Sequence, residues 1–288
     1  MEKIKIIQGN CIDKIQELKN NSIDCVVSSP PYFGLRDYGV DGQFGLEKTY
    51  QDYIANTVKV FETFKPKLKD TATIWWNVGD TYASNGIYIH SWYKKEKNKD
   101  KKNLHTNNKV RYQDRKAYRD HIIKAKDLMM IPNRVAIALQ DAGWYIRSEI
   151  IWHKPNPMPE SIKDRPTSCH EKIWLITKSK KYYYDVDAIK EPTVGNLEKR
   201  NKRNVWTITT KPFKDAHFAT FPKDLIEPCI KAGCPEGGVV LDPFGGAGTT
   251  GIVAQSLDRQ AILIELNKDY INIANKRIDK ELGMFSGS

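Results

Sequence analysis

Short apolar runs recur along the chain and predict the strands of a sheet. Several of them, such as residues 25–27 and 261–264, contain only apolar side chains. A strand that is apolar on both faces is expected in a parallel sheet covered by helices. The seven predicted strands span residues 3–8, 24–28, 72–77, 145–152, 172–177, 239–241 and 261–265.

Helical segments alternate with these runs. Between residues 50 and 68, apolar side chains recur close to helical spacing, for example at Tyr53, Phe61 and Phe64. Further helices are predicted at residues 127–142, 223–232, 249–257 and 267–282, the last of them opening with Asn267 as a cap. Strands that alternate with helices predict an α/β fold.

Two basic stretches interrupt this alternation. The net charge of +11 is concentrated in residues 93–126, which hold thirteen Lys or Arg against four acids. Residues 190–214 hold seven Lys or Arg against two acids. Such an excess favours a polyanionic partner, first of all nucleic acid, whereas a solvated loop is the alternative interpretation.

Composition argues against several other classes. No run of eighteen apolar residues is present among the 288, so no membrane span is expected. The five cysteines have no Cys or His partner at zinc-ligand spacing, so no metal is expected and the thiols are read as reduced. With no signal peptide either, we expect a cytoplasmic protein.

A glycine-rich turn near the C-terminus predicts a cofactor site. Residues 239–251, VVLDPFGGAGTTG, read as a strand, a tight turn and the start of a helix, and Glu265 ends the next strand. Glycines let the backbone approach a ligand closely, a helix start offers free N–H groups, and a carboxylate can accept both hydroxyls of a ribose. The combination indicates a nucleotide-like cofactor.

The identity of that cofactor stays open at this point. Gly246, Gly248 and Gly251 match the spacing of dinucleotide-binding loops. However, Asp242 and Pro243 stand where the first glycine would follow the strand, and only about forty residues remain to complete a dinucleotide domain. A nicotinamide-dependent oxidoreductase is therefore the weaker alternative.

A second loop, near the N-terminus, combines two prolines with a hydroxyl and an aromatic ring. Ser29, Pro30, Pro31 and Tyr32 follow the predicted strand 24–28. Ser29 Oγ and the Pro30 carbonyl can accept the two N–H bonds of an exocyclic base amine, which would aim its lone pair at a methyl donor. Tyr32 can stack on a base drawn out of the helix. A plain Pro-Pro turn is the structural alternative.

The two loops together resemble the signature motifs of amino-methylating DNA methyltransferases, in the order of the β class. The resemblance implies a doubly wound, mostly parallel, seven-stranded Rossmann-like sheet in permuted order, with basic DNA-recognition insertions. It implies Ser29, Pro30, Pro31 and Tyr32 as catalytic residues and S-adenosyl-L-methionine as cofactor. The cofactor residues would be Asn10, Asp242, Pro243, Phe244, Gly245, Gly246, Gly248, Thr249, Thr250, Glu265, Phe218 and Phe221, with Asn10 standing where the family usually has Asp.

The resemblance also divides the chain. It implies a catalytic half at 1–84, a basic insertion at 85–126, remaining sheet elements at 127–185, a target-recognition segment at 186–216 and a cofactor-binding half at 217–288. Asn77 or Asp80 is expected to orient Ser29 or the base, while a buried structural Asp is the alternative. The candidate DNA contacts are Lys101, Lys102, Arg111, Arg115, Arg200, Lys202, Arg203 and Lys211.

The expected function is site-specific methylation of double-stranded DNA on an exocyclic amine. Serine at position 29 resembles cytosine-N4 enzymes, and adenine N6 is the alternative target. RNA amine methylation, the oxidoreductase and a non-catalytic DNA-binding protein are more remote. The resemblance also implies a prokaryotic or phage origin and leaves open a cognate restriction endonuclease and a homodimer.

Overall fold

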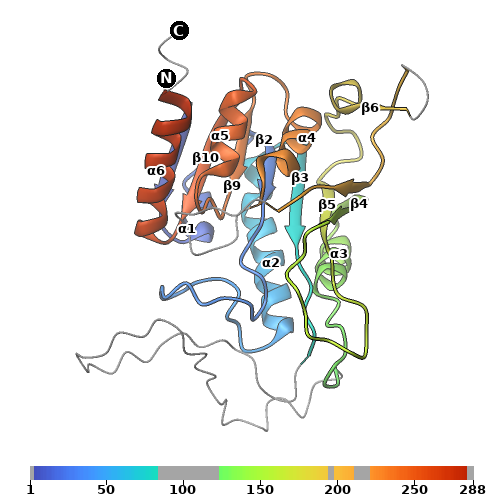
Figure 1. Ribbon diagram of the computed structural model, residues 1–288. Helices are drawn as coiled ribbons and strands as arrows, with labels where there is room; N and C mark the ends of the chain where they lie inside the picture. Colours follow the sequence, from blue (N-terminus) through green and yellow to red (C-terminus); the bar gives the residue numbers. More distant parts are fainter. Residues whose placement is uncertain (1–2, 84–122, 194–197, 211–220, 284–288) are drawn as a thin grey trace.

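A large twisted sheet organises the molecule, of which the computed structural model describes residues 3–83, 123–193, 198–210 and 221–283 (Figure 1). The sheet has eight strands in the order β1-β10-β9-β2-β3-β5-β4-β8. Five of its seven strand pairs are parallel, and the two made by β5 are antiparallel. The strands are β1 (Ile4–Gln8), β2 (Ile23–Ser28), β3 (Leu68–Val78), β4 (Tyr145–His153), β5 (His170–Thr177), β8 (Val205–Thr207), β9 (Val239–Asp242) and β10 (Gln260–Glu265).

The seven predicted strands are all present, and the α/β fold is confirmed. The eighth strand, β8, was not predicted, because three residues are too few to show an alternating pattern. Two further short strands, β6 (Glu191–Pro192) and β7 (Lys199–Arg200), form a separate antiparallel pair. The sheet therefore has eight strands instead of the predicted seven, and the additional strand, β8, pairs with β4.

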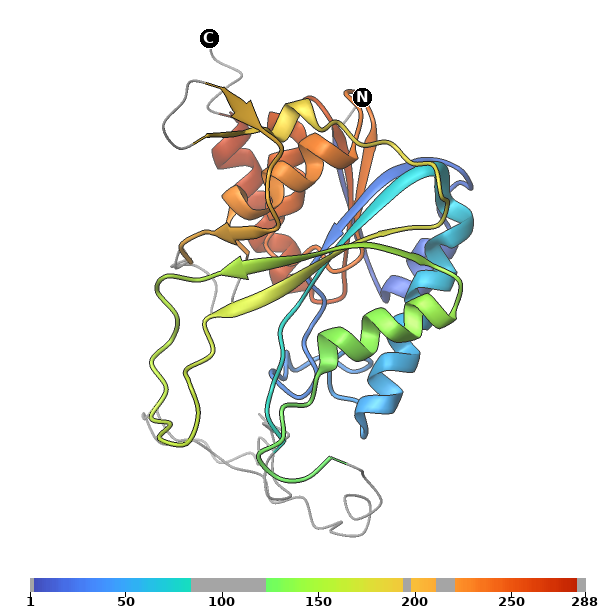
Figure 2. The ribbon, with the colours of Figure 1, turned by 90° about the vertical axis from the view of Figure 1, so that its right-hand side faces the viewer.

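Helices cover both faces of the sheet, as Figure 2 shows. They are α1 (Cys11–Gln16), α2 (Tyr50–Phe64), α3 (Ile131–Asp141), α4 (Lys223–Gly233), α5 (Thr249–Ser256) and α6 (Lys268–Gly283). Because side chains alternate along a strand, Val26 and Trp76 pack with α1, α2 and α3, while Val27 and Trp75 pack with α4 and α5. In the described ranges no helix is both long and apolar enough to cross a membrane.

Two helix boundaries differ from the predicted ones by more than one residue. The helix predicted at 127–142 begins at Ile131, because Met130 adopts a left-handed conformation with φ of 57°, which a right-handed helix cannot contain. The helix predicted to reach residue 68 ends at Phe64, because Pro66 has no N–H to donate; the short turn Lys65–Lys67 then leads into β3. The six-residue α1 was missed, since it spans less than two turns.

The centre of the sheet is where its winding reverses. Strand β9 lies beside β2, with Val26 opposite Leu241, although the two are more than two hundred positions apart in the sequence. From this pair the chain moves outward in opposite directions, to β10 through α5 and to β3 through α2. Ligands of open α/β sheets bind at the carboxyl ends of the strands at such a switch point. Both predicted motif loops leave the sheet there.

Candidate active site

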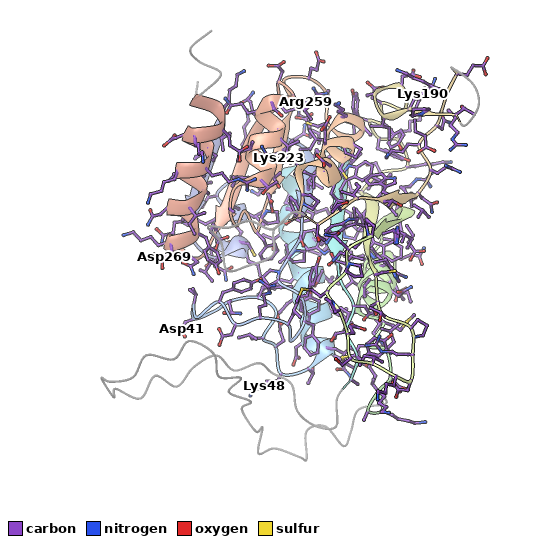
Figure 3. The ribbon with its side chains drawn as sticks, in the orientation of Figure 1. Asp41, Lys48, Lys190, Lys223, Arg259 and Asp269 are labelled. Carbon is purple, nitrogen blue, oxygen red and sulfur yellow. The ribbon has the colours of Figure 1, made fainter. Side chains whose placement is uncertain are left out.

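A cavity of about 1040 Å³ lies at the switch point and contains both motif loops. Its wall includes Ser29–Tyr32 on one side, and Asp242–Ala247 with Glu265 on the other. The loop between β2 and α2, on which Asp41 and Lys48 are labelled in Figure 3, also borders the cavity. Tyr38 of this loop meets Tyr270 of α6 edge-on, with 6.0 Å between ring centroids. The cavity is large enough for a drug-sized ligand and more.

The buried carboxylate of Asp242 holds the glycine loop in place through hydrogen bonds. The Ser28 hydroxyl and the Thr250 hydroxyl each donate to its carboxylate at 2.6 Å, and the Phe244 N–H donates at 3.1 Å. Asp242 and Thr250 are both buried. Thr250 therefore contributes to the loop through Asp242 rather than by lining the cavity, which Asp242 and Thr249 do.

Burial raises the pKa of the Asp242 carboxyl to about 6 from an ordinary 3.8. The folded protein then holds this proton more tightly than the unfolded chain, so raising the pH from about 4 to about 6 lowers the free energy of unfolding. We expect Asp242→Asn to remove this contribution, which amounts to about 3 kcal/mol at most. Urea unfolding of both proteins at pH 4.5 and pH 7 measures the difference, and parallel changes in the two proteins would contradict it.

Glu265 holds the other side of the glycine loop. Its carboxylate accepts the N–H groups of Gly246 and Asn267, both at 2.8 Å. Burial raises the pKa of this carboxyl, and the two backbone donors oppose that rise. Glu265 ends β10, as predicted, and it lines the cavity. A carboxylate fixed in this way can accept hydroxyl groups of a ligand without moving.

Backbone conformation explains the glycines of the loop. Gly246 and Gly248 have φ values of 50° and 78°, in the left-handed region that favours glycine. At Gly245 a Cβ would lie 2.9 Å from the Leu263 Cβ, so a side chain there would push the loop off β10. The loop therefore lies directly against the sheet, and its opposite side faces the cavity.

The side of the cavity that the Ser29–Tyr32 loop lines is a compact hydrogen-bond cluster around Tyr32. Ser29 Oγ donates to the Tyr32 hydroxyl at 3.1 Å, and that hydroxyl donates to Glu171 Oε2 at 2.5 Å. The Asn77 amide lies 2.7 Å from the same Glu171 oxygen and 3.4 Å from Ser29 Oγ, and it also contacts the Tyr32 hydroxyl. Burial and the neighbouring Glu171 raise the pKa of Tyr32 well above its usual value, so it stays protonated.

Two further contacts fix this loop in place. Tyr53 of α2 donates from its hydroxyl to the Pro31 carbonyl at 3.2 Å. A Cβ on Gly79 would lie 2.6 Å from the Tyr32 ring, so only glycine at this position lets the ring pack against the end of β3. The Tyr32 ring is thus held at its hydroxyl and along one edge, while it lines the cavity.

Glu171 was missed at the sequence level, as was its ion-pair partner Lys154. The prediction considered the carboxyl ends of strands, whereas Glu171 lies near the beginning of β5. Because β5 is antiparallel to β3, with Lys172 opposite Val78, the start of β5 lies at the same sheet edge as the end of β3. The polar residues His170 and Glu171 before an apolar run were the available signal in the sequence. They indicate a site residue only once β5 is known to pair antiparallel with β3.

The remaining predicted residues lie at varied distances from the cavity. Asn10 lines it, and its side chain accepts the Ile12 N–H at 2.9 Å as the cap of α1. Phe221 lines it too, whereas Gly248 packs toward α6. Asp80, which follows the end of β3, caps α3 by accepting the Ile131 N–H at 3.0 Å, so of the two polar candidates it is Asn77 that reaches Ser29.

Most of the predicted DNA contacts lie outside the described residues. These are Lys101, Lys102, Arg111, Arg115 and Lys211, and Phe218 of the predicted cofactor set also lies outside. Arg200 and Arg203 donate to Glu191 at 3.0 and 2.9 Å, and Lys202 stands over the ring of the buried Trp206. None of these three basic residues lines the cavity, and their role in DNA binding stays a prediction.

Comparison with known proteins agrees with this geometry. Residues 23–276 match the family model N6_N4_Mtase, described as DNA methylase. The chain is 47% identical to Type II methyltransferase M.SmaI of Serratia marcescens over 279 residues, covering 96% of this chain and 91% of the relative. It is 46% identical to Type II methyltransferase M.Cfr9I of Citrobacter freundii, covering 96% and 88%.

Solved structures share the fold at low sequence identity. PvuII DNA methyltransferase (cytosine-N4-specific) superposes with a TM-score of 0.71 at 18% identity, covering 99% of this chain and 92% of that one. A putative DNA modification methylase of Thermus thermophilus, complexed with S-adenosyl-L-methionine, gives a TM-score of 0.62 at 21% identity, covering 96% and 95%. The family match spans both motif loops and most of the residues that line the cavity, and the chain belongs to the N6/N4 family of DNA methylases.

Proposed function

We propose that this DNA methylase transfers its methyl group to N4 of a cytosine turned out of the double helix. The observation that supports this most is that the Ser29–Tyr32 loop and the Asp242–Ala247 loop line one cavity. A base amine held at the first loop would lie next to a cofactor held at the second. A base inside the duplex cannot reach such a cavity, so it must leave the stack.

The cofactor of the family is S-adenosyl-L-methionine, which supplies an electrophilic methyl group. The residues of the glycine side suit it. Glu265 offers a fixed carboxylate for ribose hydroxyls, Phe244 and Phe221 offer apolar surface for an adenine ring, and the loop backbone lies open to the cavity. In the proposed arrangement these residues bind and orient, and the chemistry takes place at the opposite loop.

Ser29 and Pro30 would grip the amine. Ser29 Oγ and the Pro30 carbonyl can each accept one N–H, which favours a nitrogen with its lone pair available for the methyl group. Tyr32 would stack on the base, held in position by Glu171 and Asn77. Rate enhancement then comes from positioning and electrostatics.

No covalent link between enzyme and base is needed for this transfer. Of the described residues that line the cavity, Cys11 is the one cysteine. Burial raises the pKa of its thiol to about 12, so it is a neutral thiol and a weak nucleophile at neutral pH. The chemistry of the cavity therefore supports methylation of an amine rather than of a ring carbon.

Cytosine is favoured over adenine by two observations. Serine stands at the first position of the catalytic loop, where the resemblance to cytosine-N4 enzymes lies. The similar solved structure of PvuII methyltransferase carries the description cytosine-N4-specific. Both amines present the same two donors, so the target base needs a direct test.

Base analogues in a short duplex provide that test, once the methylated site has been mapped by sequencing. Replacing the target cytosine with 5-methylcytosine should leave transfer intact, because N4 is still present. Replacing it with 2-pyrimidinone, which lacks the amine, should abolish transfer. Loss of transfer only when an adenine is replaced with purine would make adenine N6 the target and overturn the cytosine assignment.

Glu171 gives a further prediction for the same reaction. Glu171→Ala removes the acceptor that holds the Tyr32 hydroxyl and the Asn77 amide, so the ring loses its fixed orientation. We expect single-turnover methyl transfer to fall by about tenfold or more. Glu171→Gln keeps an acceptor oxygen and should retain more activity than Glu171→Ala. Equal rates in the wild type and Glu171→Ala would remove Glu171 from this role.

Partners and organisation are part of the proposal. The curated relatives are named Type II methyltransferases, which supports a role beside a restriction endonuclease that cuts the same site. The assignment of residues 85–126 to DNA contact rests on their charge, and that of residues 186–216 rests on the family resemblance together with their charge. A homodimer and a cytoplasmic location stay predictions.

A further inference from the structure

The loop between β4 and β5 carries an apolar side chain that is almost fully exposed. Met158 exposes 85% of its surface, the largest fraction among the large hydrophobic residues of the described chain. It lines the mouth of the cavity together with Asn156, Pro157 and Pro159. Single exposed apolar residues are common, but one placed at the edge of a functional cavity calls for a partner.

Hydrogen bonds hold the base of this loop in place. Its base is closed by a hydrogen bond from the Lys154 N–H to the Cys169 carbonyl at 2.7 Å. Asn156 and Thr210 bond reciprocally, since the Asn156 amide donates to the Thr210 carbonyl at 3.1 Å and accepts the Thr210 N–H at 3.0 Å. Figure 2 shows the loop extending beyond the ends of β4 and β5.

The far side of the loop is also anchored. The Arg165 guanidinium lies 3.7 Å from the centroid of the Tyr82 ring, and Arg165 pairs with Glu160 at 2.9 Å. The prolines at positions 155, 157 and 159 fix φ on both sides of Met158. Met158 therefore stands on a backbone with little freedom left to lose, which keeps the entropy cost of binding small.

The geometry points to Met158 as a wedge: we propose that it enters the DNA base stack at the position that the target base leaves. The amine-binding residue Ser29 lies inside the cavity, so the base must move from the duplex past the cavity mouth, where Met158 stands. The vacated step is an apolar slot between two flat bases. An unbranched, polarisable thioether fills such a slot, and apolar side chains inserted between base steps are a known means of stabilising distorted DNA.

This inference rests on DNA methylation by base extrusion but not on which base is methylated. A wedge lowers the cost of extrusion, so its loss matters most when the target base is well paired. It matters little when the target base is already unpaired, because extrusion is then cheap. The difference between a paired and an unpaired target base therefore distinguishes a wedge from a residue that only forms part of the cavity wall.

The test compares single-turnover methyl transfer to two duplexes that carry the mapped site, one fully paired and one mismatched at the target base. Met158→Ala should lower the rate on the paired duplex by about tenfold or more, and stay within about twofold of wild type on the mismatched one. Met158→Leu should keep most of the activity on both. Ile137→Ala, on the surface of α3, is the matched control for removal of an exposed apolar side chain.

Two outcomes would overturn the proposal. One is an unchanged rate of Met158→Ala on the paired duplex. The other is an equal loss on both duplexes, which would make Met158 part of the cavity wall instead. S-adenosylhomocysteine affinity of each variant shows that the fold is intact. Failure of the cytosine assignment would appear separately, in the base-analogue experiment, and would leave this comparison unaffected.

Discussion

Ser29→Ala is expected to lower the rate of methyl transfer by about a hundredfold to a thousandfold, the loss seen when one group of a preorganised transition-state site is removed. The serine hydroxyl is the side-chain acceptor proposed for the base amine, and it lies at the junction of Tyr32 and Asn77. Cofactor affinity should stay within about twofold of wild type, because the hydrogen bonds described for the Ser29 side chain go to the Tyr32 cluster and not to the glycine loop.

Single-turnover transfer and calorimetric titration with S-adenosylhomocysteine measure the two quantities separately. Ser22→Ala is a suitable control, because Ser22 lies just before the start of β2, at the end of the strand opposite to Ser29. Among the contacts described, its hydroxyl donates only to the Lys19 carbonyl. Its transfer rate should match wild type. An unchanged rate in Ser29→Ala would remove Ser29 from the reaction, and a large loss of cofactor affinity would show that the two loops are not separate in function.

Gly248→Val is expected to abolish measurable cofactor binding. Gly248 has a φ of 78°, which a β-branched residue adopts only with strain, and its Cβ would lie 3.2 Å from the Ala274 Cβ of α6. Gly248 does not line the cavity, so the substitution is expected to weaken cofactor binding indirectly, by changing the conformation of the turn. Its N–H donates to the Gly245 carbonyl at 2.9 Å, and shifting this turn displaces the backbone that lines the cavity.

A matched variant separates this effect from general destabilisation. Gly237 has a similar φ of 73° with open space around its Cβ, and it lies in the turn before β9, away from the cavity. Gly237→Val should lower the melting temperature through the same backbone strain and leave S-adenosylhomocysteine affinity near wild type. Normal cofactor affinity in Gly248→Val would contradict the placement of this turn beneath the cofactor.

The parts of the site that were predictable are those with a local signal. The glycine loop and the Ser-Pro-Pro-Tyr loop can be recognised from the sequence. Glycine widens and proline narrows the range of backbone conformations, and both effects act within a few residues. The buried strands β2 and β10 likewise show as continuous apolar runs. These features need no knowledge of distant residues, and together they indicated the family that the comparisons confirm.

The parts that were not predictable depend on pairing between distant segments. Glu171 reaches Tyr32 only because β5 runs antiparallel to β3, and nothing in the sequence around residue 171 states its direction. Thr250 was predicted to bind the cofactor, yet it is fully buried, because it lies in the first turn of α5 and its hydroxyl donates to the Asp242 carboxylate. Charge alone also does not show which basic side chains are held in ion pairs, as Arg200 and Arg203 beside Glu191 illustrate.

Nucleoside mass spectrometry of DNA from cells that express the protein shows whether it methylates cytosine N4 and whether that reaction needs Ser29. Wild type and Ser29→Ala are expressed in a host that lacks both N4-methylcytosine and N6-methyladenine. We expect abundant N4-methylcytosine with wild type and little or none with the variant. Detection of N6-methyladenine would be consistent with methylation of a base amine in this cavity but would contradict the cytosine assignment. Equal methylation by both proteins would contradict the role of the Ser29–Tyr32 loop.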